Sequence, residues 1–130
     1  MIKLLVVDDE PGICDILKKT FAPVGFKVLT ATNGQEALAL VKKEKPKIIF
    51  LDIRMLGMSG LEVLKEIKKI DDSVKVIMVT VVDDDKTRKE AKGLGADEFI
   101  VKPFISDYLE EVVRKQVAEL INQEKPHAES

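Results

Sequence analysis

Several residue types are scarce in this 130-residue chain, and each scarcity excludes a class of protein. The single cysteine, Cys14, excludes an intramolecular disulfide framework and suits a reducing cytosol. Cys14 lies in an apolar helical stretch, so we interpret it as a packing residue. The sole histidine, His127, lies in a polar C-terminal stretch and is interpreted as a surface residue rather than a metal ligand.

The chain also has neither a long apolar run nor an excess of basic charge. No run approaches the ~20 apolar residues that span a bilayer. The apolar start, residues 1–7, is too short for a signal-peptide core and has no cleavage site. The 21 Lys and Arg residues nearly balance the 23 Asp and Glu residues, so we expect no basic face for a nucleic-acid backbone. We therefore expect a cytoplasmic protein that binds neither membranes nor nucleic acid.

Short β-branched runs alternate with amphipathic segments along the whole chain. The expected strands are residues 2–7, 26–31, 47–51, 75–79 and 98–101. Three of them are apolar without alternation, which is typical of parallel strands buried on both faces. Five strands in strict alternation with helices imply right-handed crossovers and helices on both faces of the sheet. The sequence predicts an α/β, doubly wound, five-stranded parallel sheet of flavodoxin-like type with strand order 2-1-3-4-5.

Local patterns mark where the helices begin. Asn33 with Glu36, and Ser59 with Glu62, fit capping boxes. Ser106 is a good N-cap for the last helix. We expect one domain over residues 1–121, followed at 122–130 by a polar tail or the start of a linker.

The fourth helical segment, residues 83–94, differs from the others. Ala91 and Leu94 are nearly its only apolar anchors among many charged residues. A helix with so little to bury is held weakly and should move early. A solvated surface helix explains the pattern equally well, so a signalling role needs further support.

Polar residues follow the ends of the expected strands. The first strand runs into Asp8 and Asp9, the third into Asp52, the fourth into Thr80 and the fifth into Lys102. In an open doubly wound sheet, ligands bind beyond the carboxyl ends of the strands, where the strand order reverses. That point lies between strands one and three. We therefore expect the three acids in one crevice, flanked by the hydroxyl and the ammonium.

Three convergent carboxylates repel one another, which raises their pKa values unless a cation is present. Oxygen ligands in a small solvated cup favour Mg²⁺. Each carboxylate alone is better explained by helix capping; Asp9 or Glu10 could cap a helix that starts near Pro11. Their convergence with Thr80 and Lys102 favours a functional site.

The chemistry expected of such a site is phosphoryl transfer. A carboxylate can attack phosphorus and form an aspartyl phosphate. Lys102 and the metal would neutralise the phosphoryl oxygens, and the Thr80 hydroxyl could donate a hydrogen bond to one of them. The sequence has no Gly-rich loop for nucleotide phosphates, so we do not expect bound ATP as the donor.

The chain resembles the receiver domains of two-component response regulators over residues 3–120. The matching stretches are LVVDDE (5–10), LDIRM (51–55), MSG (58–60), VT (79–80), GAD (95–97) and VKPF (101–104). Each stretch alone is weak, but all of them in this order and at this spacing are highly specific.

The resemblance implies roles for the acidic residues. Asp52 is the expected phosphoacceptor. Asp9 and Asp52, with the backbone carbonyl of Arg54, are expected to hold Mg²⁺, and Asp8 is expected to act largely through water.

It also implies roles for residues on the later strands. Thr80 and Phe99 correspond to the hydroxyl and aromatic positions that reorient together when phosphate binds. Lys102 is expected to contact the phosphate, and the Lys102–Pro103 bond is expected to be cis.

The partners that the resemblance implies are a sensor histidine kinase or phosphotransfer protein, whose phosphohistidine is the donor, and an unidentified downstream protein or output domain. The output would be a changed surface along the fourth helix, fifth strand and fifth helix, which could also form a homodimer. Such a protein is a signalling switch that takes part in its own phosphorylation and dephosphorylation, not a turnover enzyme. The sequence fits both a complete single-domain regulator and the N-terminal part of a longer one.

Four positions depart from the family pattern. Leu56 stands where proline is usual, and Val81 stands where a small residue is usual. Arg54 and Val82 occupy positions that tune phosphate lifetime in the family. We hypothesise that the two valines slow the attack of water. Arg54 could instead pair with one of the acids of the first strand when no metal is bound.

Two alternative functions remain. A Mg²⁺-dependent phosphohydrolase can also use an aspartyl nucleophile, but such enzymes commonly need a second acid where Arg54 stands, and a cap domain for which the chain has no room. A receiver-like domain that binds partners without phosphorylation is disfavoured because every expected site residue is present.

Overall fold

The computed structural model describes residues 1–124 of the chain, so residues 125–130 of the predicted tail lie outside the described residues. Strands and helices alternate as predicted. Their bounds are β1 Lys3–Val7, α1 Pro11–Phe21, the short 3₁₀ helix η1 Ala22–Val24, β2 Lys27–Ala31, α2 Gly34–Glu44, β3 Ile48–Leu51, α3 Gly60–Ile70, β4 Lys75–Thr80, α4 Asp85–Gly93, β5 Glu98–Val101 and α5 Ser106–Glu124. The predicted strand ends agree to within one residue, and Thr80 closes β4 rather than following it.

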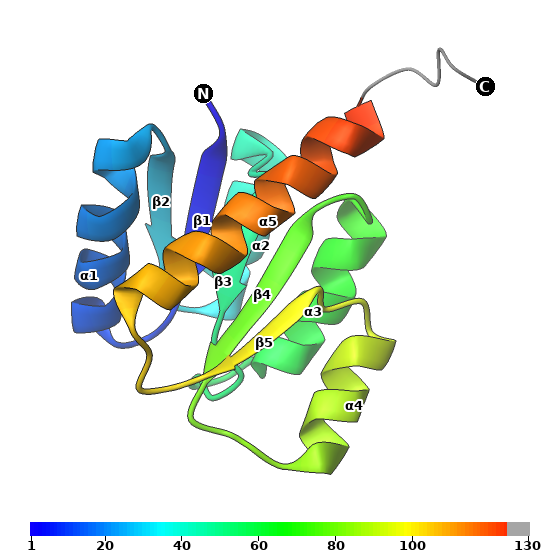
Figure 1. Ribbon diagram of the computed structural model, residues 1–130. Coiled ribbons are helices and arrows are strands. Elements are labelled where there is room, and N and C mark those ends of the chain that lie inside the picture. The colour runs from blue at the N-terminus through cyan, green and yellow to red at the C-terminus, as the bar shows by residue number, and fades with distance from the viewer. Residues whose placement is uncertain (125–130) are drawn as a thin grey trace.

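The five strands form one parallel sheet in the order β2-β1-β3-β4-β5. Helices α1 and α5 cover one face, and α2, α3 and α4 cover the other (Figure 1). This arrangement confirms the predicted doubly wound fold and its strand order. The order reverses at β1, which lies beside β3.

Burial on both faces explains the uninterrupted apolar strands. Leu5 and Val7 of β1 pack in the core under α2, α3 and α4, whereas Leu4 and Val6 pack in the core under α1 and α5. Side chains of a strand alternate between the faces of its sheet, and here each face is covered, so no position is left for a polar residue. All four side chains are at most 1% exposed.

The predicted starts of α2 and α3 are confirmed, with different capping bonds, whereas Ser106 is the first residue of α5 rather than its N-cap. Asn33 Oδ1 accepts a hydrogen bond from Glu36 N at 2.8 Å, as a capping box requires. The reciprocal bond, however, runs from Thr32 N to Glu36 Oε1 at 2.8 Å, one residue earlier than predicted. Ser59 Oγ accepts from Leu61 N at 3.2 Å.

Cys14 is a packing residue, as predicted. It is 6% exposed in the core under α1 and α5. Its thiol donates to the Asp8 carbonyl oxygen over 3.6 Å, and burial raises the pKa of this thiol. A buried thiol of raised pKa is poorly reactive.

Helix α4 buries only Ala91 and is held largely by polar contacts. It starts at Asp85, and Asp84 Oδ1 caps it by accepting from Thr87 N at 2.8 Å. The Arg88 guanidinium lies 4.7 Å from the centre of the Phe99 ring in β5. Burial of Ala91 alone confirms the prediction that α4 has few apolar anchors.

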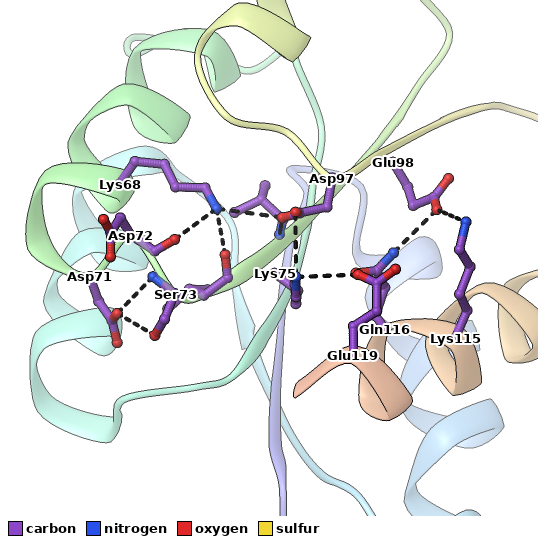
Figure 2. Close-up of polar contacts among 12 residues, drawn as sticks. Lys68, Asp71, Asp72, Ser73, Lys75, Asp97, Glu98, Lys115, Gln116 and Glu119 are labelled. Atoms are coloured by element: carbon purple, nitrogen blue, oxygen red, sulfur yellow. Dashed lines mark hydrogen bonds and ion pairs between the residues drawn. The ribbon is translucent and has the colours of Figure 1, made fainter. Parts of the chain in front are cut away.

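A polar network joins α3, β4, β5 and α5 at the end of the sheet where the strands start (Figure 2). Lys75 is 7% exposed, and its Nζ lies 3.3 Å from Glu119 Oε2 and 3.8 Å from Asp97 Oδ1. Lys68 Nζ donates to the Val74 carbonyl oxygen over 2.6 Å. These bonds connect α5 to the starts of the last two strands, far from the carboxyl ends.

Within residues 1–124, every helix is too short or too polar to cross a membrane.

Candidate functional site

The backbone ladders of the sheet continue one residue past β1 and β3. Asp8 N donates to the Ala31 carbonyl oxygen over 3.1 Å, and Asp52 N donates to the Val7 carbonyl oxygen over 3.0 Å. Both acids are therefore fixed side by side where the strand order reverses. Asp8 is 2% exposed and Asp52 is 5% exposed. The structure confirms that the first and third strands bring these two acids together.

Lys102 follows β5 and connects three carboxylates. Its Nζ lies 2.7 Å from Asp8 Oδ2, 3.0 Å from Asp52 Oδ2 and 3.2 Å from Glu10 Oε1. Its backbone N–H donates to the Thr80 carbonyl oxygen over 2.8 Å, which extends the β4–β5 ladder by one residue. The pairing of β4 with β5 thus places the Lys102 ammonium beside the acids.

Burial and neighbouring charges shift the pKa values of Lys102 and Asp8. Burial alone would lower the pKa of Lys102, but the hydrogen bonds and charges of Asp8 and Asp52 outweigh burial and raise it. Burial raises the pKa of Asp8, and the bonds from Lys102 and from the Glu10 amide offset only part of that increase. Burial of Asp8 thus outweighs the stabilisation of its ionised form by Lys102.

Carboxylate oxygens of Asp8, Glu10 and Asp52 all lie within 4.8 Å of one another. We call these three residues the acidic cluster. Asp9, which the sequence suggested as a metal ligand, is exposed and does not belong to this group, whereas Glu10 does. The donors are hard oxygen atoms with excess negative charge, and this chemistry fits Mg²⁺.

The sequence suggested that Asp9 or Glu10 could cap the helix at Pro11, and it did not place Glu10 among the acids of the site. Glu10 occupies the N-cap position of α1 but makes no side-chain capping bond. Its backbone N–H donates instead to Asp8 Oδ1 over 3.0 Å. This bond from the amide two residues on forms a turn at Asp8, and the chain bends at Asp9, so the Glu10 carboxylate comes back beside Asp8. The two-residue spacing from Asp8 was the signal that could have identified it.

The Arg54 side chain is exposed, and among the ion pairs within residues 1–122 it has none. The suggested pairing of Arg54 with an acid of the first strand is therefore not seen, because Lys102 occupies that place. Arg54 N donates to Asp52 Oδ1 over 3.2 Å and so orients the carboxylate.

Thr80 and Phe99 lie on neighbouring strands. Thr80 is fully buried, and its Oγ1 accepts from Val82 N at 3.2 Å. Phe99 pairs in register with Met78, two residues before Thr80, so the alternation of strand side chains puts both on one face of the sheet. Phe99 is half-buried beneath Arg88.

The hydrophobic residues that depart from the family pattern lie beyond the carboxyl ends of β3 and β4. Leu56 is 87% exposed in the β3–α3 loop, and Val81 is 54% exposed just after β4. Val82 is partly buried against the core under α4. The Lys102–Pro103 bond is cis, as expected.

Comparison with known proteins gives a consistent result. A family model described as the response regulator receiver domain matches residues 4–114. Sporulation initiation phosphotransferase F of Bacillus subtilis is 39% identical over 113 residues, which are 87% of this chain and 91% of that protein. The probable transcriptional regulator ycf27 of Porphyridium aerugineum is 40% identical over 112 residues, 86% of this chain but 46% of that protein. The chain thus matches nearly all of the first relative and less than half of the second.

Solved structures show the same similarity. A response regulator receiver domain protein (CheY-like) from Methanospirillum hungatei superposes with a TM-score of 0.92 at 28% identity, covering 95% of this chain and 98% of the other. The Vibrio cholerae chemotaxis protein CheY4 gives a TM-score of 0.84 at 31% identity, covering 88% and 98%.

Proposed function

Because the chain belongs to the response regulator receiver domain family, we propose that Asp52 accepts a phosphoryl group from a phosphohistidine of a sensor histidine kinase or phosphotransfer protein. One observation carries this proposal: the Lys102 ammonium lies 3.0 Å from the Asp52 carboxylate and 2.7 Å from Asp8, where the strand order reverses. The protein is a signalling switch, as the family is.

In the proposed reaction an Asp52 carboxylate oxygen forms a bond to phosphorus while the bond between phosphorus and the histidine nitrogen breaks. The electron pair of that bond stays on the imidazole, and Asp52 becomes an acyl phosphate. Lys102 then exchanges a carboxylate contact for a phosphoryl oxygen. The Thr80 hydroxyl would turn from Val82 N to donate to another phosphoryl oxygen, and Phe99 would reorient with it.

We further propose that Asp8, Asp9, Asp52 and the Arg54 backbone carbonyl hold Mg²⁺, with Glu10 as an additional acid. When bound, the cation would neutralise charge on the phosphoryl oxygens. The acidic cluster supports this assignment because, among the ion pairs within residues 1–122, its three carboxylates share a single ammonium.

The direct test is to incubate the protein with a small acyl phosphate and Mg²⁺ and to measure its intact mass. Wild-type protein should gain one phosphoryl group, and Asp52→Asn should gain none, because it lacks the attacking carboxylate. Thermal unfolding of Asp52→Asn would confirm that this variant is folded. An adduct on Asp52→Asn would contradict the proposal, and continuous turnover of phosphate monoesters would favour the phosphohydrolase.

Magnesium should stabilise the folded protein, because the acidic cluster exists only in the folded state. At a concentration of about 100 times the dissociation constant, the gain is about 2.7 kcal/mol, which corresponds to a rise in Tm of about 10 °C for a chain of this length. Burial raises the pKa of Asp8, so protons compete for it and the rise should shrink as the pH is lowered from neutral.

Differential scanning fluorimetry with and without Mg²⁺ would measure this effect. Asp8→Asn should reduce the rise, whereas Asp72→Asn, an exposed acid at the C-terminal end of α3, should not. An unchanged Tm at every Mg²⁺ concentration at neutral pH would rule out the proposed metal site.

We propose that the phosphorylated state is recognised by a downstream protein or output domain through α4, β5 and α5. The weak apolar anchoring of α4 and the position of Phe99 beneath Arg88 support this. The relatives fit either organisation, since one is nearly the length of this chain and another is about twice as long. We retain residues 1–121 as the domain, 122–130 as a tail or linker, the cytoplasm as its location and slow autodephosphorylation as proposals.

A further inference from the structure

Arg88 of α4 covers the aromatic ring of Phe99 in the neighbouring strand β5 (Figure 1). Its guanidinium carbon lies 4.7 Å from the centre of that ring, within the range of a cation–π contact. Two surface hollows, of about 340 Å³ and about 440 Å³, each include both residues in their lining. Free space therefore adjoins the ring, and the ring is not enclosed on every side.

Asp83, in the loop between β4 and α4, holds the Arg88 guanidinium in place. Asp83 Oδ1 accepts a hydrogen bond from Arg88 Nε over 2.9 Å and lies 2.9 Å from Nη2 as well. Two nitrogen atoms of the rigid guanidinium on one carboxylate fix its orientation better than a single bond would. The Arg88 and Asp83 side chains are 42% and 54% exposed, so the pair adds little to the stability of the fold. Its main effect is on where the guanidinium lies.

The loop that carries Asp83 is itself tied to Thr80. Thr80 Oγ1 accepts a hydrogen bond from Val82 N over 3.2 Å, and Asp83 is the next residue. Asp83 in turn holds Arg88, and Arg88 covers the Phe99 ring. An unbroken series of contacts thus joins the hydroxyl to the aromatic ring by way of the loop and α4.

We propose that the Asp83–Arg88 ion pair restrains the Phe99 ring in the orientation found here until phosphorylation releases it. This role rests on the proposed phosphorylation of Asp52. When the Thr80 hydroxyl turns to a phosphoryl oxygen, the loop loses the bond that fixed it, and Asp83 shifts with the loop. Arg88 is then drawn off the ring, and Phe99 turns. Asp83 and Arg88 are positioning residues that act through Phe99, not catalytic residues.

The restraint sets how readily the protein reaches its active state. A ligand that binds one of two states must supply the free energy that separates them, so removing a contact made only in the inactive state tightens binding. An exposed cation–π contact is equivalent to a factor of about two to five in such an equilibrium. Loss of Arg88 should therefore tighten the binding of a phosphoryl analogue by that factor, although Arg88 does not touch the analogue.

The test uses beryllofluoride, a phosphoryl analogue that binds a carboxylate, together with Mg²⁺. Labelling with para-fluorophenylalanine gives one fluorine NMR resonance for each of the five Phe residues, and Phe99→Leu identifies that of Phe99. Beryllofluoride should move this resonance in the wild type and leave it unmoved in Asp52→Asn. In Arg88→Gln the resonance of the free protein should already lie part of the way to the bound position. Half-saturation of this variant should need about two- to fivefold less beryllofluoride.

Further variants show whether Asp83 acts through Arg88. Asp83→Asn should also tighten binding, and the double variant should not exceed Arg88→Gln alone, because both changes remove the same restraint. Arg88→Lys keeps a cation near the ring and should lie closer to the wild type. Lys89→Gln and Asp85→Asn are the matched controls, since both residues are exposed in α4 and neither forms an ion pair within residues 1–122. Both controls should bind beryllofluoride as the wild type does.

The outcomes separate failure of the proposed function from failure of the Asp83–Arg88 restraint. If the wild type neither binds beryllofluoride nor moves the Phe99 resonance, the proposed function fails and the restraint with it. If the wild type responds but Arg88→Gln matches it in affinity and in the position of the Phe99 resonance, only the restraint is overturned. Additive effects of Asp83→Asn and Arg88→Gln, or equal effects of the controls, would also overturn it. Thermal unfolding would check that each variant is folded.

Discussion

Replacing Lys102 with methionine should lower the free energy of unfolding by about 3 kcal/mol at neutral pH without metal. Methionine keeps most of the volume of lysine but removes the ammonium that contacts Asp8, Glu10 and Asp52. The Lys102, Asp8 and Asp52 side chains are 7%, 3% and 6% exposed, so water cannot replace the lost partner well. Removing one member of a buried ion pair typically costs about 3–5 kcal/mol. We expect the lower end because the exposed Glu10 opens this site to solvent.

The same variant should respond more strongly to Mg²⁺ than the wild type does. Removal of the ammonium leaves the acidic cluster with one more uncompensated negative charge, which attracts a divalent cation more strongly. We expect Mg²⁺ to bind at least about tenfold more tightly, equivalent to about 1.4 kcal/mol. Urea unfolding with and without Mg²⁺ would measure both effects. A purely structural role for Lys102 predicts destabilisation but no gain in Mg²⁺ affinity.

The pH dependence gives a second signature of the Lys102 contacts. The pKa of Lys102 is raised in the folded state, so its contribution to stability is present at neutral pH and is lost only as the pH rises through that raised pKa. The pKa of Asp8 is also raised, so this acid favours the folded state when protonated. Without the bond from Lys102 the pKa of Asp8 should rise further, and the variant should regain stability when the solution is acidified.

Lys115→Met is the matched control for Lys102→Met. Lys115 also forms an ion pair, 3.4 Å from Glu98, but its side chain is 64% exposed. Exposed pairs contribute at most about 1 kcal/mol. The control should therefore be nearly as stable as the wild type and should respond to Mg²⁺ as the wild type does. Equal losses of unfolding free energy in the two variants would show that burial of the Lys102 ion pairs adds nothing to stability.

The fold was predictable because local patterns and burial agree along the chain. The uninterrupted apolar strands require a sheet covered on both faces, and Leu4, Leu5, Ile48 and Ile49 are all fully buried. The position of Asp52 followed in turn, because the carboxyl ends of adjacent parallel strands meet at one edge.

Other features depend on contacts that local patterns do not encode. Glu10 joins the acidic cluster because the chain bends at Asp9 before α1, which brings the Glu10 carboxylate to Lys102, 92 residues away. Lys75 starts a strand and would be expected at the surface, yet it is buried because Glu119 of α5 reaches it from 44 residues away (Figure 2). Single-sequence periodicity reports which face a residue occupies, not which distant side chain meets it.

Gly60→Ala should be among the most destabilising substitutions in the chain, with a loss of about 3 kcal/mol or more. Gly60 begins α3 directly behind Asp52, and its N–H donates to the Ile53 carbonyl oxygen over 2.9 Å. A Cβ atom at this position would lie 2.0 Å from the Asp52 carbonyl oxygen and 2.7 Å from Ile53 Cα. Both are backbone atoms, so no side chain can rotate away and the β3–α3 segment itself must shift. Overpacking commonly costs about 1–3 kcal/mol, and more where relief requires backbone movement.

The loss of function should exceed the loss of stability. The same shift moves Asp52 relative to Lys102, and a misplacement of about 1 Å at a reacting group can slow a reaction about 10²-fold. Gly12→Ala is the matched control: Gly12 lies in α1, and no atom stands within 4 Å of a Cβ built on it. That variant should be as stable as the wild type or gain up to about 1 kcal/mol from better helix propensity. Denaturant unfolding and the rate of acyl phosphate labelling, measured on both variants under conditions where both are folded, would distinguish them. If Gly60→Ala unfolded and reacted like Gly12→Ala, the close approach of α3 to the backbone behind Asp52 would not be what positions the Asp52 carboxylate.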